Sequence, residues 1–94
     1  MKWSESVNWS GVPEHIRPGI IAYVEQGVPN GDFVTAVFEN DLAKAVAYGD
    51  LVNLRALVEI TRFVTWYAPP MCKGSPASVA AWVGWKGMGG LSDG

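Results

Sequence analysis

The chain has 94 residues, of which 49% are hydrophobic and 17% charged, and its formal net charge is −2. This length suits one small domain, and the acidic balance argues against a general binder of nucleic-acid backbones, which needs a basic face. Charged residues usually make up about 25% of a globular domain. A chain with so few charges exposes apolar surface as a monomer, so we expect a homo-oligomer.

The chain contains one cysteine and one histidine. This excludes an intrachain disulfide and a thiolate zinc cluster, and we expect neither a metal nor a cofactor. The N-terminus lacks the apolar segment of a signal peptide, and no apolar run approaches the roughly 20 residues that span a bilayer. We therefore expect a protein of the cytoplasm that does not bind membranes.

Residues 1–12 are predicted to form an N-terminal arm without regular structure. Polar chain ends are often poorly ordered. Trp3 and Trp9 favour the other interpretation, in which the arm packs onto the domain or onto a neighbouring subunit.

The first helix is predicted over residues 13–27. Pro13 suits a first helical position, and Gly27 suits the position just after a helix end. Pro18 lies inside this stretch, where a proline removes a hydrogen bond. Either the first turn is a separate piece or Pro18 lies close to the helix start.

The longest helical pattern covers residues 31–48, with apolar residues at positions 34, 37, 38, 42, 45 and 46. It predicts one central helix. Asp41 falls within its apolar stripe, next to Asn40, and a buried carboxylate needs a partner. We expect Asp41 to be an internal clamp that accepts hydrogen bonds from Arg17, Arg62 or His15.

Gly49 and Asp50 predict a short connection to a third helix over residues 51–67, which ends before Ala68-Pro69-Pro70. One face of this helix is apolar and is expected in the core. A second stripe on it carries Arg55, Glu59, Arg62 and Trp66.

Ser75 and Pro76 predict the start of a fourth helix that reaches Trp85. Residues 87–94 are rich in glycine and are predicted to be disordered. The expected fold is all-α, a small bundle of about four helices in a domain of residues 13–86.

Catalytic signatures are absent from the sequence, which has no nucleophile elbow, phosphate-binding loop or dinucleotide fingerprint. A single histidine also leaves little scope for a triad, so we expect a protein that is not an enzyme. Aromatic rings can stack on bases, and Arg or Lys can bind phosphate. The candidate ligand-binding residues are Arg17, Tyr23, Arg62, Trp66 and Lys73, with His15, Asn40 and Asp41 in supporting roles.

Each of these candidates also has a structural interpretation. Aromatic residues build cores and subunit interfaces. His15 and Arg17 could be a solvated first helical turn, and Lys73 could be a solvated side chain beside the cap of the fourth helix.

The motifs PEHIR (13–17), YVEQG (23–27) and GDFVTAVFENDL (31–42), with Ala68-Pro69, Gly74-Ser75-Pro76 and Trp82, resemble a family of short proteins encoded by tailed phages and prophages. The resemblance covers residues 12–83. It implies a phage origin and a small accessory protein outside the virion. It assigns no binding residue.

Small phage accessory proteins commonly neutralise host defences, and some do so by sequestering cyclic oligonucleotide signals between subunits. Our leading expectation is therefore a non-catalytic anti-defence protein that sequesters a small nucleotide ligand. The alternative is a module that docks on a host protein through exposed tryptophans. A DNA-binding regulator is a third interpretation, which the acidic charge disfavours.

Overall fold

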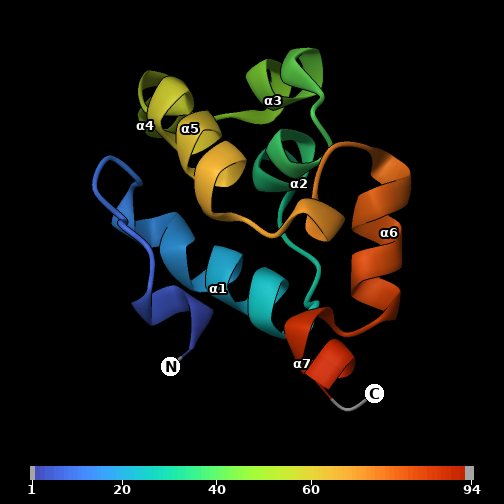
Figure 1. Ribbon diagram of the computed structural model, residues 1–94. Coiled ribbons are helices and arrows are strands. Elements are labelled where there is room, and N and C mark those ends of the chain that lie inside the picture. Colours follow the sequence, from blue (N-terminus) through green and yellow to red (C-terminus); the bar gives the residue numbers. More distant parts are fainter. Residues whose placement is uncertain (1, 93–94) are drawn as a thin grey trace.

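The structure is a computed structural model that describes residues 2–92, in which seven α-helices and three short 3-10 helices occur and no strand does (Figure 1). The α-helices are α1 (Arg17–Gln26), α2 (Asp32–Phe38), α3 (Leu42–Tyr48), α4 (Leu51–Arg55), α5 (Leu57–Tyr67), α6 (Pro76–Gly84) and α7 (Gly87–Ser92). The 3-10 helices are η1 (Trp3–Glu5), η2 (Glu14–Ile16) and η3 (Pro70–Cys72). The all-α prediction is confirmed, whereas the expected number of about four helices is too low.

Helix α1 begins four residues later than predicted. Residues Glu14–Ile16 form the separate turn η2, and Pro18 then occupies the second position of α1. A proline there removes no helical hydrogen bond, because the first N–H groups of a helix have no partner within it. Gly27 ends the helix with φ 68°, a left-handed conformation that suits glycine.

The predicted central helix over residues 31–48 is wrong, because the structure holds two helices there. Helix α2 ends at Phe38 and α3 begins at Leu42. The apolar positions of two short helices happen to continue one helical spacing across the corner between them. Ala45 is buried, but Leu42 and Val46 are 66% and 50% exposed instead of lying in the core.

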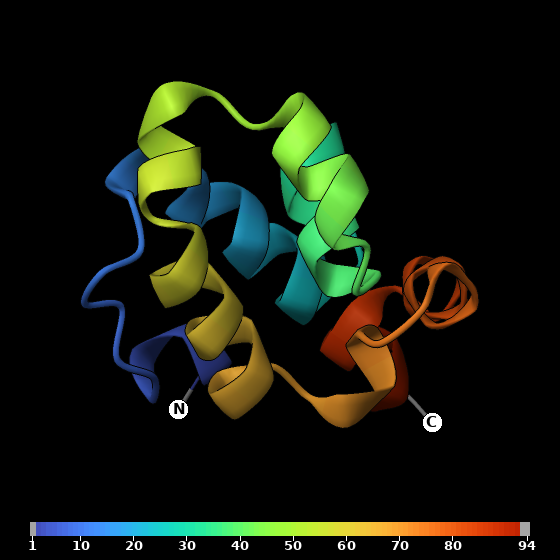
Figure 2. The same cartoon turned by 90° about the horizontal axis from the view of Figure 1, so that it is seen from above.

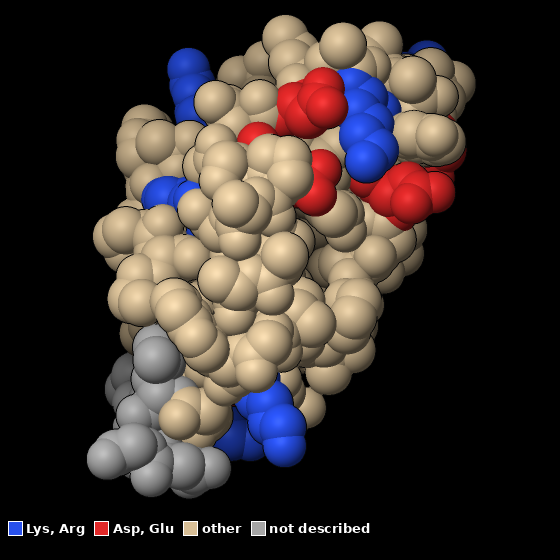
Figure 3. Space-filling view, turned by 90° about the vertical axis from the view of Figure 1, so that its right-hand side faces the viewer, with Lys and Arg blue, Asp and Glu red and all other residues tan. Residues whose placement is uncertain are grey.

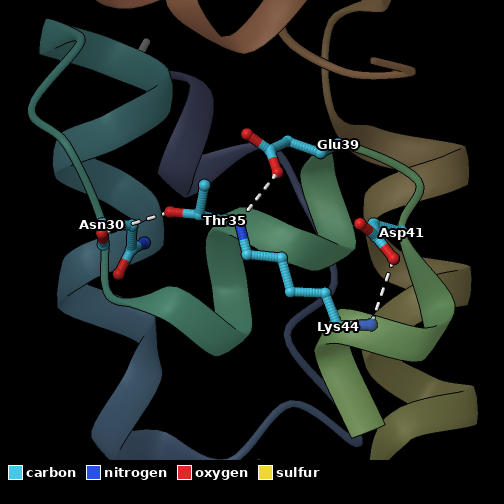
Figure 4. Close-up of polar contacts among 5 residues, drawn as sticks. All are labelled: Asn30, Thr35, Glu39, Asp41 and Lys44. Carbon is cyan, nitrogen blue, oxygen red and sulfur yellow. Dashed lines mark hydrogen bonds and ion pairs between the residues drawn. The ribbon is translucent and has the colours of Figure 1, made fainter. Parts of the chain in front are cut away.

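Backbone hydrogen bonds explain this corner. Asn40 has φ 62°, its N–H donates to Val37 O at 3.1 Å, and the N–H of Asp41 donates to Ala36 O at 2.9 Å. This pair of bonds is the Schellman motif that ends many helices, with asparagine in the left-handed position usually held by glycine. The Asp41 carboxylate then caps α3 by accepting from the backbone N–H of Lys44 at 3.0 Å (Figure 4).

The predicted third helix, residues 51–67, is also interrupted. Asp50 caps α4 by accepting from the N–H of Asn53 at 2.8 Å, as its position predicts. Ala56, with φ −98° and ψ 7°, then separates α4 from α5. Helix α5 ends at Tyr67, before the prolines.

The start of α6 is confirmed, since Ser75 Oγ accepts from the N–H of Ser78 at 3.1 Å and Pro76 is the first helical residue. Positions 87–92 form α7, so the prediction of a disordered tail is wrong there, and positions 93 and 94 lie outside the described residues. Helix α7 packs beside the C-terminal end of α1 (Figure 1).

The N-terminal arm contains one turn of 3-10 helix and packs onto α5. Trp3 Nε1 donates to the carbonyl of Tyr67 at 2.8 Å, and Trp9 Nε1 donates to the carbonyl of Ser4 at 2.9 Å. Trp3 also meets Trp9 edge-on, with ring centroids 5.7 Å apart. The two tryptophans therefore hold the arm on the domain.

The core lies where α1, α2, α5 and α6 meet. Seen from above, α4 and α5 follow one side of the molecule and α2 and α3 the other, with α1 passing beneath them (Figure 2). The largest fully buried side chains come from several of these elements and include Trp82, Tyr23, Phe38, Ile20 and Ile60. Helix α5 therefore has one face in the core and another open to solvent, and the open face carries the candidate site.

Candidate functional site

Two of the five predicted ligand residues, Arg62 and Trp66, line the same surface hollow of about 200 Å³. They lie four residues apart on α5, a spacing that places two side chains on one helix face. The hollow is formed by α5 on one side and by the N-terminal arm on the other. Its lining residues are Asn8, Ser10, Glu59, Arg62, Phe63, Trp66 and Tyr67.

The arm reaches the hollow because its backbone is fixed at several points. Trp9 stacks on the ring of Phe63, and Arg17 donates from Nε to the Val12 carbonyl at 2.9 Å and from Nη2 to the Trp9 carbonyl at 3.3 Å. Gly11 has φ 87°, and a Cβ added there would lie 3.0 Å from the Cβ of Glu59. A side chain at position 11 would push the arm away from α5.

The polar groups of the hollow are exposed and weakly engaged. Arg62 Nη1 lies 4.0 Å from Glu59 Oε1, and the two side chains are 59% and 52% exposed. This distance is too long for a hydrogen bond. Trp66 is 69% exposed. The guanidinium and the indole are therefore both accessible to a ligand, while the carboxylate offsets part of the arginine's charge.

Arg17 and Lys73 do not join Arg62. The guanidinium of Arg17 is turned towards the carbonyls of the arm. Lys73 Nζ donates to the carbonyls of Val64 and Thr65 at 2.9 and 2.7 Å, near the C-terminal end of α5. Both cations donate to backbone carbonyls, and those of Trp9 and Val64 also accept from the N–H groups of Val12 and Ala68, so Arg17 and Lys73 have a structural role.

Tyr23 is a core residue, with 2% of its surface exposed. Its hydroxyl donates to the Cys72 carbonyl at 2.7 Å, and its ring packs edge-on against Phe38. Burial raises the pKa of the Tyr23 phenol and raises the pKa of the Cys72 thiol to about 12. Tyr23 therefore cannot stack on a ligand that arrives from solvent.

The predicted ion pair between Asp41 and an arginine is wrong, because Asp41 caps α3. The side chain that crosses the corner is Lys44, whose Nζ lies 3.7 Å from Glu39 Oε1 (Figure 4). His15 is also elsewhere, with Nε2 4.0 Å from Asp50 Oδ2. None of the three supporting residues named from the sequence lines the hollow that holds Arg62 and Trp66.

A second depression, of about 180 Å³, lies between the α2–α3 corner and α5. It is lined by Val37, Phe38, Asn40, Thr61, Val64, Thr65, Lys73 and Gly74. Its walls are largely apolar, and its one cation, Lys73, is bonded to carbonyls. The sequence pattern could not reveal this depression, because it depends on the corner at Asn40.

Within residues 2–92, no group of three or more His, Cys, Asp or Glu side chains is placed to hold a metal ion. No helix in the described part of the chain has the length and apolar character needed to cross a bilayer. Comparisons with protein-family models, with curated proteins and with solved structures gave no match.

Proposed function

We propose that the protein is a non-catalytic binding protein whose hollow beside Trp66 takes a planar, negatively charged ligand of the nucleotide type. The observation that carries the proposal is the shared position of Arg62 and Trp66 in one hollow, with both side chains exposed. These two groups offer a cation for a phosphate and a flat ring for a base.

The lining supplies the contacts that such a ligand needs. Stacking of a base on an aromatic side chain contributes about 1–3 kcal/mol, and Trp66 has an exposed indole for this. Arg62 can bind a phosphate through two parallel N–H groups. Asn8 and Ser10 add donors and acceptors from the arm.

Charge and size narrow the ligand class further. Glu59 lies 4.0 Å from Arg62, so the hollow suits a singly charged phosphodiester better than a polyphosphate. Its volume of about 200 Å³ is below the roughly 300–1,000 Å³ of pockets that enclose whole ligands. One hollow therefore accommodates one nucleotide unit of a larger molecule.

The resemblance to tailed-phage accessory proteins gives this binding a biological setting. In that setting the ligand is a cyclic oligonucleotide that a host uses as an immune signal. The protein lowers its free concentration by binding it, and no chemical step is required.

Docking on a host protein is the second candidate, and a separate observation favours it. Several large apolar side chains outside the hollow are exposed, among them Leu42, Leu51 and Val52 at 66%, 62% and 56%. The face over α6, whose residues 76–84 include no charged side chain, presents a broad area free of Lys, Arg, Asp and Glu (Figure 3). Apolar surface of this kind is typical of protein interfaces.

Isothermal titration calorimetry against cyclic di- and trinucleotides tests the proposal. We expect saturable binding of at least one member, with at least a tenfold loss of affinity in Arg62→Ala and in Trp66→Ala. Trp85→Ala, which removes a 44% exposed tryptophan outside the hollow, is the matched control and should bind like the unmodified protein. No heat with any member, together with co-purification of one host protein, would refute the nucleotide proposal in favour of docking.

A further inference from the structure

The outer side of the α4–α5 segment carries four exposed side chains at intervals of four, three and four residues. They are Arg55, Glu59, Arg62 and Trp66. Glu59, Arg62 and Trp66 have the spacing of a seam along one face of α5, as in helices that pack on each other, and Arg55 continues the series on α4 across the break at Ala56. Within the described chain no other α-helix packs on this seam, although the N-terminal arm borders it where Gly11 lies against Glu59, and all four residues are exposed.

The order of these side chains is self-complementary. The midpoint between Glu59 and Arg62 in the sequence is also the midpoint between Arg55 and Trp66. An antiparallel copy of the same segment, related by a two-fold axis through this midpoint, would bring opposite charges together twice. It would also bring each indole opposite a guanidinium.

We propose that a second copy of this chain packs antiparallel on the α4–α5 segment and forms a two-fold symmetric dimer. Glu59 of each copy then pairs with Arg62 of the other, and Trp66 of each copy faces Arg55 of the other. Two-fold dimers use the same patch on both subunits, so self-complementary charge order is what such an interface requires. A parallel arrangement would instead place like charges opposite each other.

The energy of this interface comes mainly from its apolar parts. Surface ion pairs contribute only about 0–1 kcal/mol each, so Glu59 and Arg62 set the register more than the affinity. Trp66 is 69% exposed and Val58, on the same outer side, is 62% exposed. Pairing removes these side chains from water, and a guanidinium over an indole adds a cation–π contact.

The break at Ala56 divides the seam unequally. Glu59, Arg62 and Trp66 belong to α5, whereas Arg55 ends α4. The reciprocal Glu59–Arg62 pairs thus form the centre of the interface, and the contacts between Arg55 and Trp66 form its two ends.

This inference goes beyond the proposed ligand and stands without it, because dimer mass is measured on the unliganded protein. The seam and the hollow share Arg62 and Trp66, so the second copy and the ligand compete for these two side chains, and ligand binding favours the monomer. If no nucleotide binds, the dimer proposal is unaffected. If the protein does not dimerise, the ligand can still bind in the hollow of each monomer.

Charge reversal tests the pairing, with molar mass measured by size-exclusion chromatography and light scattering. The unmodified protein should have twice the 10.1 kDa mass of one chain. Glu59→Arg and Arg62→Glu should each shift it to the monomer, because each places like charges opposite one another. The double variant, Glu59→Arg with Arg62→Glu, restores opposite charges and should be a dimer again.

Glu14→Arg, at an exposed position outside the seam, matches the change in net charge of Glu59→Arg and should remain dimeric. Far-ultraviolet circular dichroism confirms that each variant is folded. A monomeric unmodified protein would overturn the proposal. So would single reversals that stay dimeric, or a folded double variant that stays monomeric.

Discussion

The indole ring of Trp9 stacks on the phenyl ring of Phe63, with the ring centroids 4.5 Å apart and the planes inclined by 26°. Trp3 meets the same phenyl ring edge-on at 5.9 Å. Phe63 is a core residue of α5, so this stack joins the N-terminal arm to the helix that carries Arg62 and Trp66. The second wall of the hollow exists because the arm is held there.

Removal of this stack should destabilise the protein and open the hollow. Large-to-small substitutions of well-packed aromatic residues cost about 3–5 kcal/mol, and because Trp9 is only partly buried we expect about 2–3 kcal/mol for Trp9→Ala. Urea unfolding followed by circular dichroism measures this. Trp85→Ala, at an exposed position, should cost less than about 1 kcal/mol. Equal stability of the two variants would show that the arm is not anchored by Trp9.

Different substitutions of Asn40 should have very different effects on the free energy of unfolding. The Asn40 φ of 62° suits glycine and opposes β-branched residues. We expect Asn40→Gly to change the free energy of unfolding by less than about 0.5 kcal/mol, and Asn40→Val to lower it by about 1–2 kcal/mol. Thermal unfolding of both variants provides the comparison. If both have the melting temperature of the unmodified protein, the left-handed corner is contradicted.

Lys73 should contribute to stability and not to ligand affinity. Its ammonium donates to the carbonyls of Val64 and Thr65, and hydrogen bonds to charged groups contribute about 1.5–3 kcal/mol. We expect Lys73→Met to lower the free energy of unfolding by about 1–2 kcal/mol, since these carbonyls are partly accessible to water. Calorimetry on the folded variant should give an unchanged dissociation constant. A large loss of affinity at unchanged stability would show that Lys73 binds the ligand and does not stabilise the fold.

Stability should fall at high pH because of Cys72 and Tyr23. Burial raises the pKa of the Cys72 thiol from 9.0 to about 12, and raises the pKa of the Tyr23 phenol above its ordinary 10.0. The unfolded chain therefore releases these protons first as the pH rises. The protonated Cys72 and Tyr23 make their full contribution to the free energy of unfolding below about pH 9. This contribution decreases towards pH 12, by up to about 1.4 kcal/mol per pH unit for each group.

Urea unfolding at a series of pH values from 8 to about 11 measures this decrease. The Cys72→Ala variant should show a shallower decline, because Tyr23 alone then titrates between the two states. Identical pH profiles of the two proteins would contradict the buried, protonated thiol.

Local chemistry predicted several helix ends correctly. Capping depends only on neighbours a few residues away, so it can be predicted from the sequence. The predicted helix ends are present at Gly27, Asp50, Ser75 and Pro76. The apolar spacing does not predict the helix end at Asn40. Its signal was available in principle, because asparagine tolerates positive φ and an aspartate follows it, but the apolar spacing concealed the corner.

Features that depend on distant contacts could not be predicted from the pattern. Helix α7 contains three glycines among its first four residues, a composition that disfavours helices. Tertiary packing outweighs this: a Cβ on Gly87 would lie 2.5 Å from the backbone nitrogen of Gly27, so the glycines let α7 approach α1.

The candidate site shows the same division between local and distant effects. Helical spacing on one element predicts that Arg62 and Trp66 share a face, and both line the same hollow. Arg17, Tyr23 and Lys73 come from other elements, and their partners are carbonyls that a sequence does not reveal. The sequence shows which residue types could bind a ligand, but not which of them are already bonded to other groups within the fold.

The most direct test of the central claim is a titration that observes Trp66 itself. In a ¹⁵N-labelled sample, Trp66→Phe identifies the indole N–H resonance of Trp66, and a cyclic dinucleotide is then added in steps. We expect a saturable shift of that resonance, while the resonance of the buried Trp82 indole N–H, which is bonded to the Tyr23 carbonyl at 3.0 Å, stays in place. A cyclic nucleotide that binds and leaves the Trp66 resonance unmoved, or a panel of them that moves no indole resonance, would contradict it.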